Sequence, residues 1–301
     1  MRDIFIKHLI ELIKKDPSVI LITADLGFGS FDQLSQNFPD NFLNVGVAEQ
    51  NMIGVASGMA MQGRKPFCYS IGNFTSLRCL EQIRNDASYH ELDICIVSNG
   101  GGFSYGGLGV SHHSTEDVSI MLSLPEIEIL TPSTDIEIEY LVKYAYSNKG
   151  TKYLRLDKLF ETESSMKADL KPIREIKKGK NNKIYCYGSI ISEAFRLRNL
   201  MKKDLGIYSV PIISSISEKN FLDSLADTKK LIVLEENALN GGLGALISNI
   251  ILKNNIHLES FHAFGLPRKF AKVVGDQDFM RKYFNLNAES IMKILSKNND
   301  D

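Results

Sequence analysis

Short apolar runs that alternate with helical patterns are the feature of this sequence that most constrains its fold. Runs with the character of buried strands occupy residues 19–22, 67–71, 94–98, 127–130 and 153–156. Apolar residues at helical spacing mark the segments before and between these runs, at residues 1–16, 49–61, 76–89, 116–122 and 135–146. Because consecutive parallel strands need a long crossover, which is usually a helix, this alternation predicts a mainly parallel sheet with helices on both faces.

A second series of the same kind follows a stretch in which the periodicity fails. Between residues 160 and 182 charged residues become frequent and the regular apolar spacing is lost, which is typical of a linker. Strand-like runs then return at residues 183–187, 206–210, 231–235 and 256–261, with helical patterns from residue 192, at 242–252 and near the end. We therefore predict an α/β protein with two domains, residues 1–160 and 183–301, each a mainly parallel sheet flanked by helices, joined by a linker at residues 161–182.

Composition and charge exclude several classes of partner. Of the 301 residues, 44% are hydrophobic and 24% are charged, and the formal net charge is -1. Such a chain has no field that would draw it to nucleic acid or to an anionic membrane, and no segment approaches the ~20 apolar residues of a membrane span. The four cysteines, at positions 68, 79, 95 and 186, lack the CxxC spacing of metal and redox sites. We predict a cytoplasmic protein with reduced cysteines that binds neither nucleic acid nor membrane and has no metal site of its own.

The stretch from residue 42 to residue 60 is the most informative part of the sequence. A short apolar run passes through Gly46 into a helical pattern that carries Glu49 at its first turn. Small residues are frequent in this helix, at positions 54, 56, 57, 58 and 60, and they let another backbone or a flat ligand approach closely. On spacing alone, the carboxylate of Glu49 can simply complement the positive end of the helix, an effect of about 0.3–1 kcal/mol.

The order of residues in this stretch resembles the pyrimidine-binding domain of the transketolase family, in which this glutamate is catalytic. The resemblance implies that Glu49 binds thiamine diphosphate through N1′ of its aminopyrimidine, which makes the cofactor's own 4′-amino group basic enough to take the thiazolium C2 proton. To do so, the carboxyl group has to hold or share a proton near neutral pH. Surroundings of small apolar residues favour this, because burial penalises the charged form.

The resemblance continues through the strand and aromatic loop at residues 66–74, which in this family receive the pyrimidine ring. Phe74 is the predicted stacking residue, since it offers an aromatic face to a flat heterocycle, and Tyr69 is the alternative. A phenylalanine after a strand is otherwise more often a core residue. Asp25, which follows the first strand-like run, corresponds to a segment that lies near the cofactor and the dimer interface in transketolases.

Cationic residues are candidates for holding an anionic substrate group. Arg78 follows Phe74 by one helical turn and can make a forked contact, although an ion pair between subunits would explain it equally well. Arg155 and Lys158 fall where relatives place an arginine for the substrate phosphate. Lys158 would contribute a point charge there rather than a planar fork.

A glycine-rich loop spans residues 99–113 and ends in two adjacent histidines. It lacks the ending of a phosphate-binding P-loop, and no GxGxxG opens a helix here. By resemblance this loop faces the substrate, and His112 is the family's active-site histidine, suited to contacting a substrate hydroxyl or carbonyl and to exchanging protons near neutral pH. The role of His113 stays open, because no third ligand at a suitable spacing supports a metal site. Transketolases carry an acidic residue shortly before this histidine, whereas Leu108 and Gly109 stand here, so their usual sugar phosphate specificity does not follow.

The second domain resembles the transketolase C-terminal domain at residues 234–238, 241–244 and 265–267, and we assign it to assembly and regulation. Transketolases hold Mg²⁺ and the cofactor diphosphate with a Gly-Asp-Gly motif and a later asparagine, in a separate N-terminal domain. That motif is missing from this sequence, since Gly275 and Asp276 are followed by Gln277. The resemblance therefore implies a partner, an N-terminal transketolase subunit, in an α2β2 assembly with thiamine diphosphate at each heteromeric interface.

The leading functional hypothesis is thiamine diphosphate-dependent transfer of a two-carbon ketol unit from a ketose, phosphorylated or otherwise modified, to an aldose. Glu49 would activate the cofactor, His112 would orient the substrate, and the cationic residues would hold its anionic end. The β subunit of a 2-oxoacid dehydrogenase and a synthase similar to deoxyxylulose phosphate synthase use the same glutamate and are the enzymatic alternatives. A regulatory subunit without catalytic activity is the alternative outside catalysis.

Overall fold

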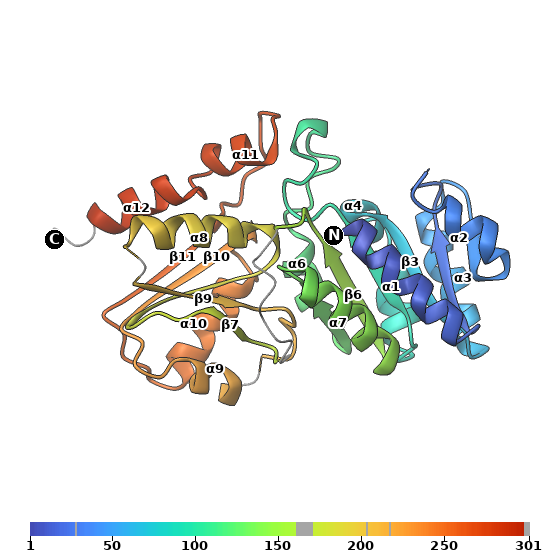
Figure 1. Cartoon of the computed structure of the whole chain (residues 1–301), viewed down its shortest axis with the longest axis horizontal. Helices are drawn as coiled ribbons and strands as arrows, with labels where there is room; N and C mark the ends of the chain where they lie inside the picture. The colour runs from blue at the N-terminus through green and yellow to red at the C-terminus, as the bar shows by residue number, and fades with distance from the viewer. Residues whose placement is uncertain (28, 161–170, 203, 217, 298–301) are drawn as a thin grey trace.

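The computed structural model describes residues 1–27, 29–160, 171–202, 204–216 and 218–297. Two α/β units lie side by side along the long axis of the molecule, one built from each half of the chain (Figure 1). Each unit contains a sheet, of six strands in the first and of five in the second, with helices packed against it. The predicted fold class is therefore confirmed.

The first sheet is parallel, with the strand order β2-β1-β3-β4-β6-β5. Its strands are β1 (Val19–Thr23), β2 (Phe42–Asn44), β3 (Lys65–Ile71), β4 (Cys95–Asn99), β5 (Ile127–Leu130) and β6 (Thr151–Leu156). The chain passes from β1 outward to β2 and then crosses back to β3, on the other side of β1. The carboxyl ends of β1 and β3 therefore form a switch point, which is where open α/β sheets bind their ligands.

Helical segments cover both faces of this sheet. They are α1 (Arg2–Lys15), α2 (Asp32–Asn37), α3 (Glu49–Met61), α4 (Gly72–Thr75), α5 (Leu80–Gln82), α6 (Asp117–Leu122), α7 (Asp135–Ser147), the 3-10 turns η1 (Pro39–Asn41) and η3 (Gly106–Leu108), and the π-helical segment η2 (Ile83–Ser88). On one face, Phe5 of α1 packs in a core with Phe67 of β3. On the other face, Met52 of α3 and Ile83 of η2 pack in a core with Cys68 of β3. Neighbouring positions of β3 belong to different cores because successive residues of a strand point to opposite faces.

The helix predicted at residues 49–61 forms, whereas the one predicted at residues 76–89 does not form as a single helix. The chain makes one helical turn in α4, leaves helical geometry, and resumes it in α5 and η2. Hydroxyl groups explain the break, since the side chains of Thr75 and Ser76 donate to the carbonyl oxygen of Gly72 at 3.1 and 2.7 Å and so compete with the helical ladder. Arg78 consequently lies in a turn rather than in a helix.

The second sheet has the strand order β11-β10-β8-β9-β7 and is parallel except for β7. Its strands are β7 (Arg174–Lys177), β8 (Asn182–Cys186), β9 (Leu205–Ser209), β10 (Lys230–Ala238) and β11 (Ser260–Leu266). The accompanying helices are η4 (Gly188–Ile190), α8 (Ile191–Leu200), α9 (Glu218–Ser224), α10 (Leu243–Lys253), α11 (Gln277–Tyr283) and α12 (Ala288–Lys297). The last strand begins four residues later than the run predicted at 256–261, so the sequence did not predict its bounds.

The segment predicted as a linker contains a strand that the sequence analysis missed. Residues 161–170 of that linker lie outside the described residues, but residues 174–177 form β7 on the edge of the second sheet. Arg174 and Ile176 of β7 are buried, and Nη1 of Arg174 donates to Oε1 of Glu137 on α7 at 2.5 Å. A four-residue strand with one apolar residue facing inward is too short to stand out from a charged stretch by periodicity.

Glu235, within β10, is a buried carboxyl group that lies against the start of α10. Its oxygens accept hydrogen bonds from the backbone N–H groups of Leu243 and Gly244, both at 2.9 Å, and from the hydroxyl of Tyr187 at 3.1 Å. Burial raises the pKa of Glu235 to about 7, although these donors act in the opposite direction.

We expect this carboxyl group to make the stability of the chain pH-dependent. The folded state keeps the proton up to about pH 7, whereas the unfolded chain releases it near the ordinary value of 4.5. The free energy of unfolding should therefore fall as the pH rises between these two values, and should be insensitive to this group above them. Urea denaturation across that range will show a flatter profile for Glu235→Gln than for the parent chain, and parallel profiles would contradict the assignment.

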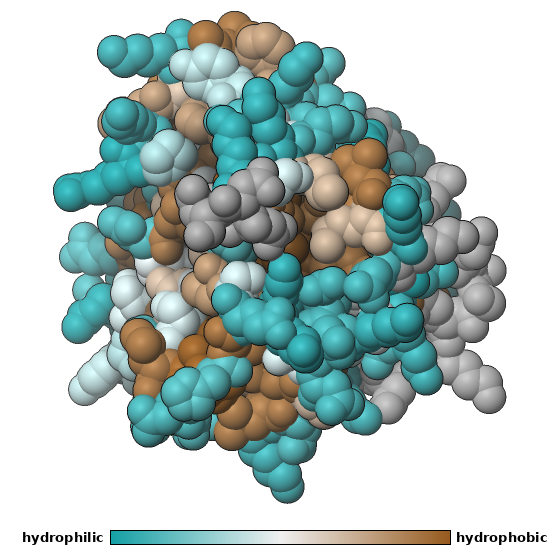
Figure 2. Space-filling model, turned by 90° about the vertical axis from the view of Figure 1, so that its left-hand side faces the viewer, coloured by the Kyte–Doolittle hydropathy of each residue, from teal (hydrophilic) through white to brown (hydrophobic). Residues whose placement is uncertain are grey.

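Apolar side chains remain at the surface of the C-terminal domain. The end of the molecule that this domain forms is mostly hydrophilic, with apolar patches between the polar side chains (Figure 2). Its exposed apolar side chains include Leu200, Leu252, Phe270 and Val274. All four cysteines, by contrast, are buried and free. None of the helices in the described part of the chain is long and apolar enough to cross a membrane.

Candidate active site

Glu49 lies at the carboxyl edge of the first sheet, where β2 turns into α3. Gly46, with φ of +75°, makes this turn, in a backbone conformation that favours glycine. Met52 and Ile53 fix α3 on the sheet, and only 3% of the Glu49 side chain is exposed. Its carboxylate has a partner within the chain, since Oε2 accepts a hydrogen bond of 2.6 Å from Nη1 of Arg78.

Phe74 and Arg78 come from the segment that follows β3 at the same edge. The guanidinium of Arg78 lies over the Phe74 ring, with Cζ 4.4 Å from the ring centroid. The guanidinium is therefore held between an aromatic face and the buried carboxylate of Glu49. His112 completes the group, because its ring centroid lies 5.3 Å from that of Phe74 in an edge-to-face arrangement. We call Glu49, Phe74, Arg78 and His112 the Glu49 cluster.

The loop that carries His112 is tied to α4 by Asn73. Nδ2 of Asn73 donates to the carbonyl oxygens of Val110, Ser111 and His113, the last of them at 2.7 Å. The hydroxyl oxygen of Ser111 and Nδ1 of His112 are 3.0 Å apart. The sequence analysis did not select Asn73, and its position directly before the predicted stacking residue is the only signal that could have found it.

Asp25 lies at the same edge, directly beyond β1. It has a positive φ of 56°, and Oδ1 accepts a hydrogen bond of 3.1 Å from Nδ2 of Asn44. Oδ1 of Asn44 in turn accepts from the backbone N–H groups of Asp25 at 2.9 Å and of Gly46 at 3.0 Å. Asp25 and Asn44 together brace the turn that leads into Glu49.

A cleft of about 1020 Å³ is lined by residues of both domains. Asn73 and Ser111 line it from the first domain, next to Phe74 and His112 in the chain, and the second domain contributes Arg268, Lys269 and Phe270 among other residues. The four residues of the Glu49 cluster themselves are not among the residues that line the cleft. Arg268 and Lys269 follow residues 265–267, which the sequence analysis assigned to the C-terminal domain without a role in binding. For that reason it did not predict these two cations as site residues.

Two family models cover most of the chain. Residues 1–160 match that of the transketolase pyrimidine binding domain, and residues 173–291 match that of the transketolase C-terminal domain. This chain belongs to the transketolase family.

Transketolase-related proteins of similar length resemble the chain from end to end. A provisionally named transketolase C-terminal section of Methanocaldococcus jannaschii is 30% identical, over 97% of this chain and 94% of its own. One of the subunits of the apulose-4-phosphate transketolase of Actinobacillus succinogenes is 27% identical, over 98% of this chain and 96% of its own. Among solved structures, a split gene transketolase described as an inactive beta4 tetramer shares the fold, with a TM-score of 0.85 at 24% identity over 98% of this chain and 96% of that one.

Tyr69, the alternative stacking residue of this transketolase-family chain, lies outside the Glu49 cluster. It points to the face of β3 that α1 covers, where its ring packs edge-on against Phe31, with the centroids 4.9 Å apart, and stacks with Phe5 at 6.1 Å. Burial raises the pKa of its phenol well above the usual value. Of the two aromatic candidates, only Phe74 lies beside Glu49. The sequence left them undecided because a shift of one residue along a strand reverses the face.

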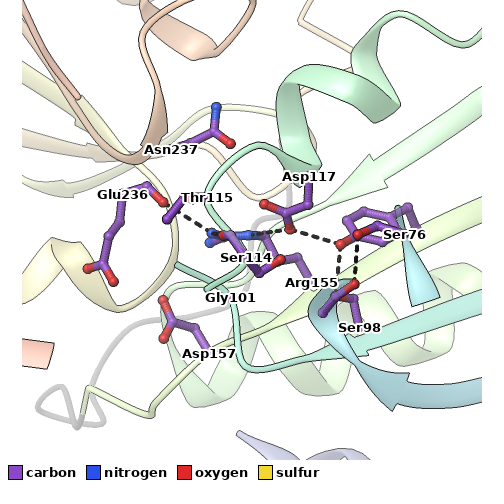
Figure 3. A network of polar contacts seen from close by, with 12 residues as sticks. Ser76, Ser98, Gly101, Ser114, Thr115, Asp117, Arg155, Asp157, Glu236 and Asn237 are labelled. Carbon is purple, nitrogen blue, oxygen red and sulfur yellow. Dashed lines mark hydrogen bonds and ion pairs between the residues drawn. The ribbon is translucent and has the colours of Figure 1, made fainter. Parts of the chain in front are cut away.

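Arg155 is not placed to hold a substrate phosphate, and this expectation needs correction. Its guanidinium is buried between the domains, where Nε donates to Oδ2 of Asp117 at 2.9 Å (Figure 3). Nη2 donates to the carbonyl oxygens of Ser114 at 3.1 Å and of Glu236 at 3.2 Å. A buried guanidinium with these partners joins the two domains. The sequence places Arg155 in an apolar run, which in retrospect is the signal for a buried, paired arginine.

Lys158 is also separated from the Glu49 cluster. Its side chain is exposed and lines a smaller cleft, of about 260 Å³, with Phe160, Ser189, Asp278 and Arg281 among the lining residues. No residue of the Glu49 cluster takes part in this lining. Arg155 and Lys158 therefore both lie away from the Glu49 cluster.

Glu236 of the C-terminal domain holds the glycine-rich loop of the first domain. One of its carboxylate oxygens accepts from the backbone N–H of Phe103 and the other from Nε of Arg281, both at 2.6 Å. Gly102, with φ of +60°, permits this approach, because a Cβ there would lie 2.5 Å from Oε1 of Glu236. The second domain thus supports the loop that carries His112. Sequence reasoning missed this link, for which the two adjacent glutamates in the otherwise apolar run of β10 were the available signal.

His113, whose role the sequence left open, packs inside the loop. It is buried, its Nε2 lies 3.0 Å from the carbonyl oxygen of Gly106, and its ring lies edge-on to that of Phe103 with the centroids 5.1 Å apart. These contacts indicate a structural role. In the part of the chain that the structure describes, no group of three His, Cys, Asp or Glu side chains could hold a metal ion.

Proposed function

We propose that this chain is the subunit of a split transketolase that carries the pyrimidine-binding and C-terminal domains. In this proposal the assembled enzyme transfers a two-carbon ketol unit from a ketose to an aldose with thiamine diphosphate as cofactor. The observation that carries it is the placement of a buried carboxylate, Glu49, beside an aromatic face, Phe74, at the switch point of a parallel sheet. Membership of the transketolase family supports the same reading.

The residues of the Glu49 cluster fit an aminopyrimidine ring. The guanidinium of Arg78 is planar, donates an N–H group to Glu49 and lies over the ring of Phe74. An aminopyrimidine with a hydrogen on its ring nitrogen or amino group can make the same two kinds of contact. The arginine therefore stands in for a flat, hydrogen-bonding group between a carboxylate and an aromatic face.

The roles of the chain's own residues follow from these positions. Thiamine diphosphate, when bound, supplies the carbon nucleophile of the reaction. Glu49 shares a proton with the pyrimidine ring nitrogen in a site from which water is excluded by burial. Phe74 supports the ring by stacking, and Asp25 braces the turn that presents Glu49. His112 reaches the same place from the glycine-rich loop and is suited to hydrogen-bonding a substrate oxygen or moving a proton from it.

The substrate in this proposal carries an anionic group. Arg268 and Lys269 line the cleft from the C-terminal domain, and Asn73 and Ser111, the chain neighbours of Phe74 and His112, line it from the first domain. Two cations in one cleft favour a phosphorylated or otherwise acidic sugar. The related transketolase of Actinobacillus succinogenes is named for a sugar phosphate, which agrees with this class.

The proposal includes a partner that supplies the diphosphate and Mg²⁺ site, in an α2β2 assembly. Relatives that match this chain over nearly their whole length are named as the C-terminal section of a transketolase and as one of the subunits of a transketolase. The sequence also lacks the Gly-Asp-Gly motif with which transketolases hold Mg²⁺.

Calorimetry with thiamine diphosphate and Mg²⁺ tests the division of labour between the subunits. We expect heat of tight binding only when this chain and its N-terminal partner are mixed, because each holds one end of the cofactor. Tight binding by this chain alone would argue against a site shared between two chains. Release of CO2 from pyruvate by the mixture would favour a decarboxylating enzyme over ketol transfer.

A further inference from the structure

Arg78 stands at the centre of the Glu49 cluster and has two contacts that matter for its role. Its Nη1 donates to Glu49 at 2.6 Å, and its guanidinium lies over Phe74 with Cζ 4.4 Å from the ring centroid. These are the two residues that the proposed function assigns to the pyrimidine ring. A guanidinium and a pyrimidine ring cannot occupy the same face of Phe74 and the same carboxylate oxygen together.

The two ends of this ion pair differ in their freedom to move. The Glu49 side chain is 3% exposed and fixed in the first turn of α3, whereas the Arg78 side chain is 45% exposed. Arg78 also lies in the turn between α4 and α5 and not within a helix. If the pair opens, the arginine moves and the glutamate stays.

We infer that Arg78 is a placeholder, which occupies the pyrimidine position of this chain and is displaced when the cofactor's aminopyrimidine enters. This inference rests on the proposed function. While the guanidinium is in place, it keeps the carboxylate of Glu49 paired in a site where an unpaired charge would be costly. Once displaced, the guanidinium loses its partner Glu49 and becomes available to an anionic substrate group. Loading of the cofactor thereby releases a cation for the substrate.

The placeholder lowers the apparent affinity for the pyrimidine ring by the fraction of molecules in which the pair is open. If about one molecule in ten is open, the apparent dissociation constant is about tenfold higher than that of the open site. Removing the guanidinium should therefore tighten binding of a pyrimidine probe. A residue that only contributes to a site, in contrast, weakens binding when it is removed.

The test uses the full chain and 4-amino-5-hydroxymethyl-2-methylpyrimidine, which is the pyrimidine half of the cofactor, with binding followed by NMR titration. We expect Arg78→Ala to bind this probe about tenfold more tightly than the parent chain. Arg78→Lys should lie between them, because an ammonium group keeps the charge but cannot lie flat on Phe74. Arg84→Ala is the matched control, since Arg84 is exposed and contacts its neighbour Asn85, and it should bind like the parent chain.

The outcomes separate this inference from the proposed function. Tighter binding by Arg78→Ala that disappears in the double variant with Glu49→Gln supports the placeholder. Equal or weaker binding by Arg78→Ala, with binding still dependent on Glu49, overturns the placeholder and leaves the pyrimidine site standing. Absence of Glu49-dependent binding in every variant overturns both. Thermal melting of each variant verifies that it is folded, and Arg78→Lys, which retains a cation beside Glu49, serves if the alanine variant does not fold.

Discussion

Replacing Glu49 by glutamine is expected to lower the turnover of the assembled enzyme by about 10²–10⁴-fold. Glutamine has nearly the shape of glutamate and can still accept a hydrogen bond, but it cannot share a proton with the pyrimidine ring nitrogen. The side chain is 3% exposed, so water cannot easily replace the missing group. Turnover is measured with the chain and its N-terminal partner under saturating cofactor, which separates lost chemistry from lost binding.

Glu81→Gln provides the matched control for this experiment. Glu81 is an exposed carboxylate on α5, in the same region of the chain, and its replacement should leave turnover within about twofold, as surface substitutions rarely have large effects. A loss for Glu49→Gln no larger than that of Glu81→Gln would remove the basis for an enzymatic role of this chain.

Replacing Arg155 by methionine is expected to destabilise the chain by about 3–5 kcal/mol, the usual cost of removing one partner of a buried ion pair. The side chains of Arg155 and Asp117 are 1% and 0% exposed, and Oδ1 of Asp117 already lacks a hydrogen-bond partner. Methionine would leave the buried carboxyl group of Asp117 without its cationic partner, with the hydroxyl of Tyr153 at 2.8 Å as its remaining side-chain donor. Urea denaturation measures this loss as a fall in the free energy of unfolding.

Two further variants show whether this effect comes from the buried charge. Lys143→Met breaks the exposed pair with Glu139 and should cost less than about 1 kcal/mol. Adding Asp117→Leu to Arg155→Met removes the stranded carboxylate and should recover part of the loss. If Arg155→Met were as mild as Lys143→Met, the domains would not depend on this contact.

The parts of the fold that have a strong period could be predicted from the sequence. The helix at residues 49–61 was found because its start follows a strand and a glycine, and Glu49 at its first turn was found with it. The sheet order could not be predicted, yet strand–helix alternation alone places the segments after β1, β2 and β3 at one edge of a parallel sheet. Asp25, Glu49 and Phe74 each follow one of these strands, and for that reason they lie at this edge.

The contacts that could not be predicted depend on tertiary structure. The face to which Tyr69 points changes with a shift of one residue, and only packing against Phe5 and Phe31 decides it. The burial of Arg155 depends on residues of a second domain, and the pairing of Arg78 with Glu49 joins positions 29 residues apart. No spacing rule connects such positions, because they meet only when the sheet has formed.

The central claim is that Glu49 belongs to a pyrimidine site, and a crystal structure of the complete assembly with thiamine diphosphate tests it most directly. The distance to be measured joins a carboxylate oxygen of Glu49 to the ring nitrogen N1′. We predict a hydrogen bond of roughly 2.6–3.2 Å, with the ring beside Phe74 and the guanidinium of Arg78 withdrawn. A structure in which Glu49 remains paired with Arg78 while the pyrimidine ring binds elsewhere would contradict the account.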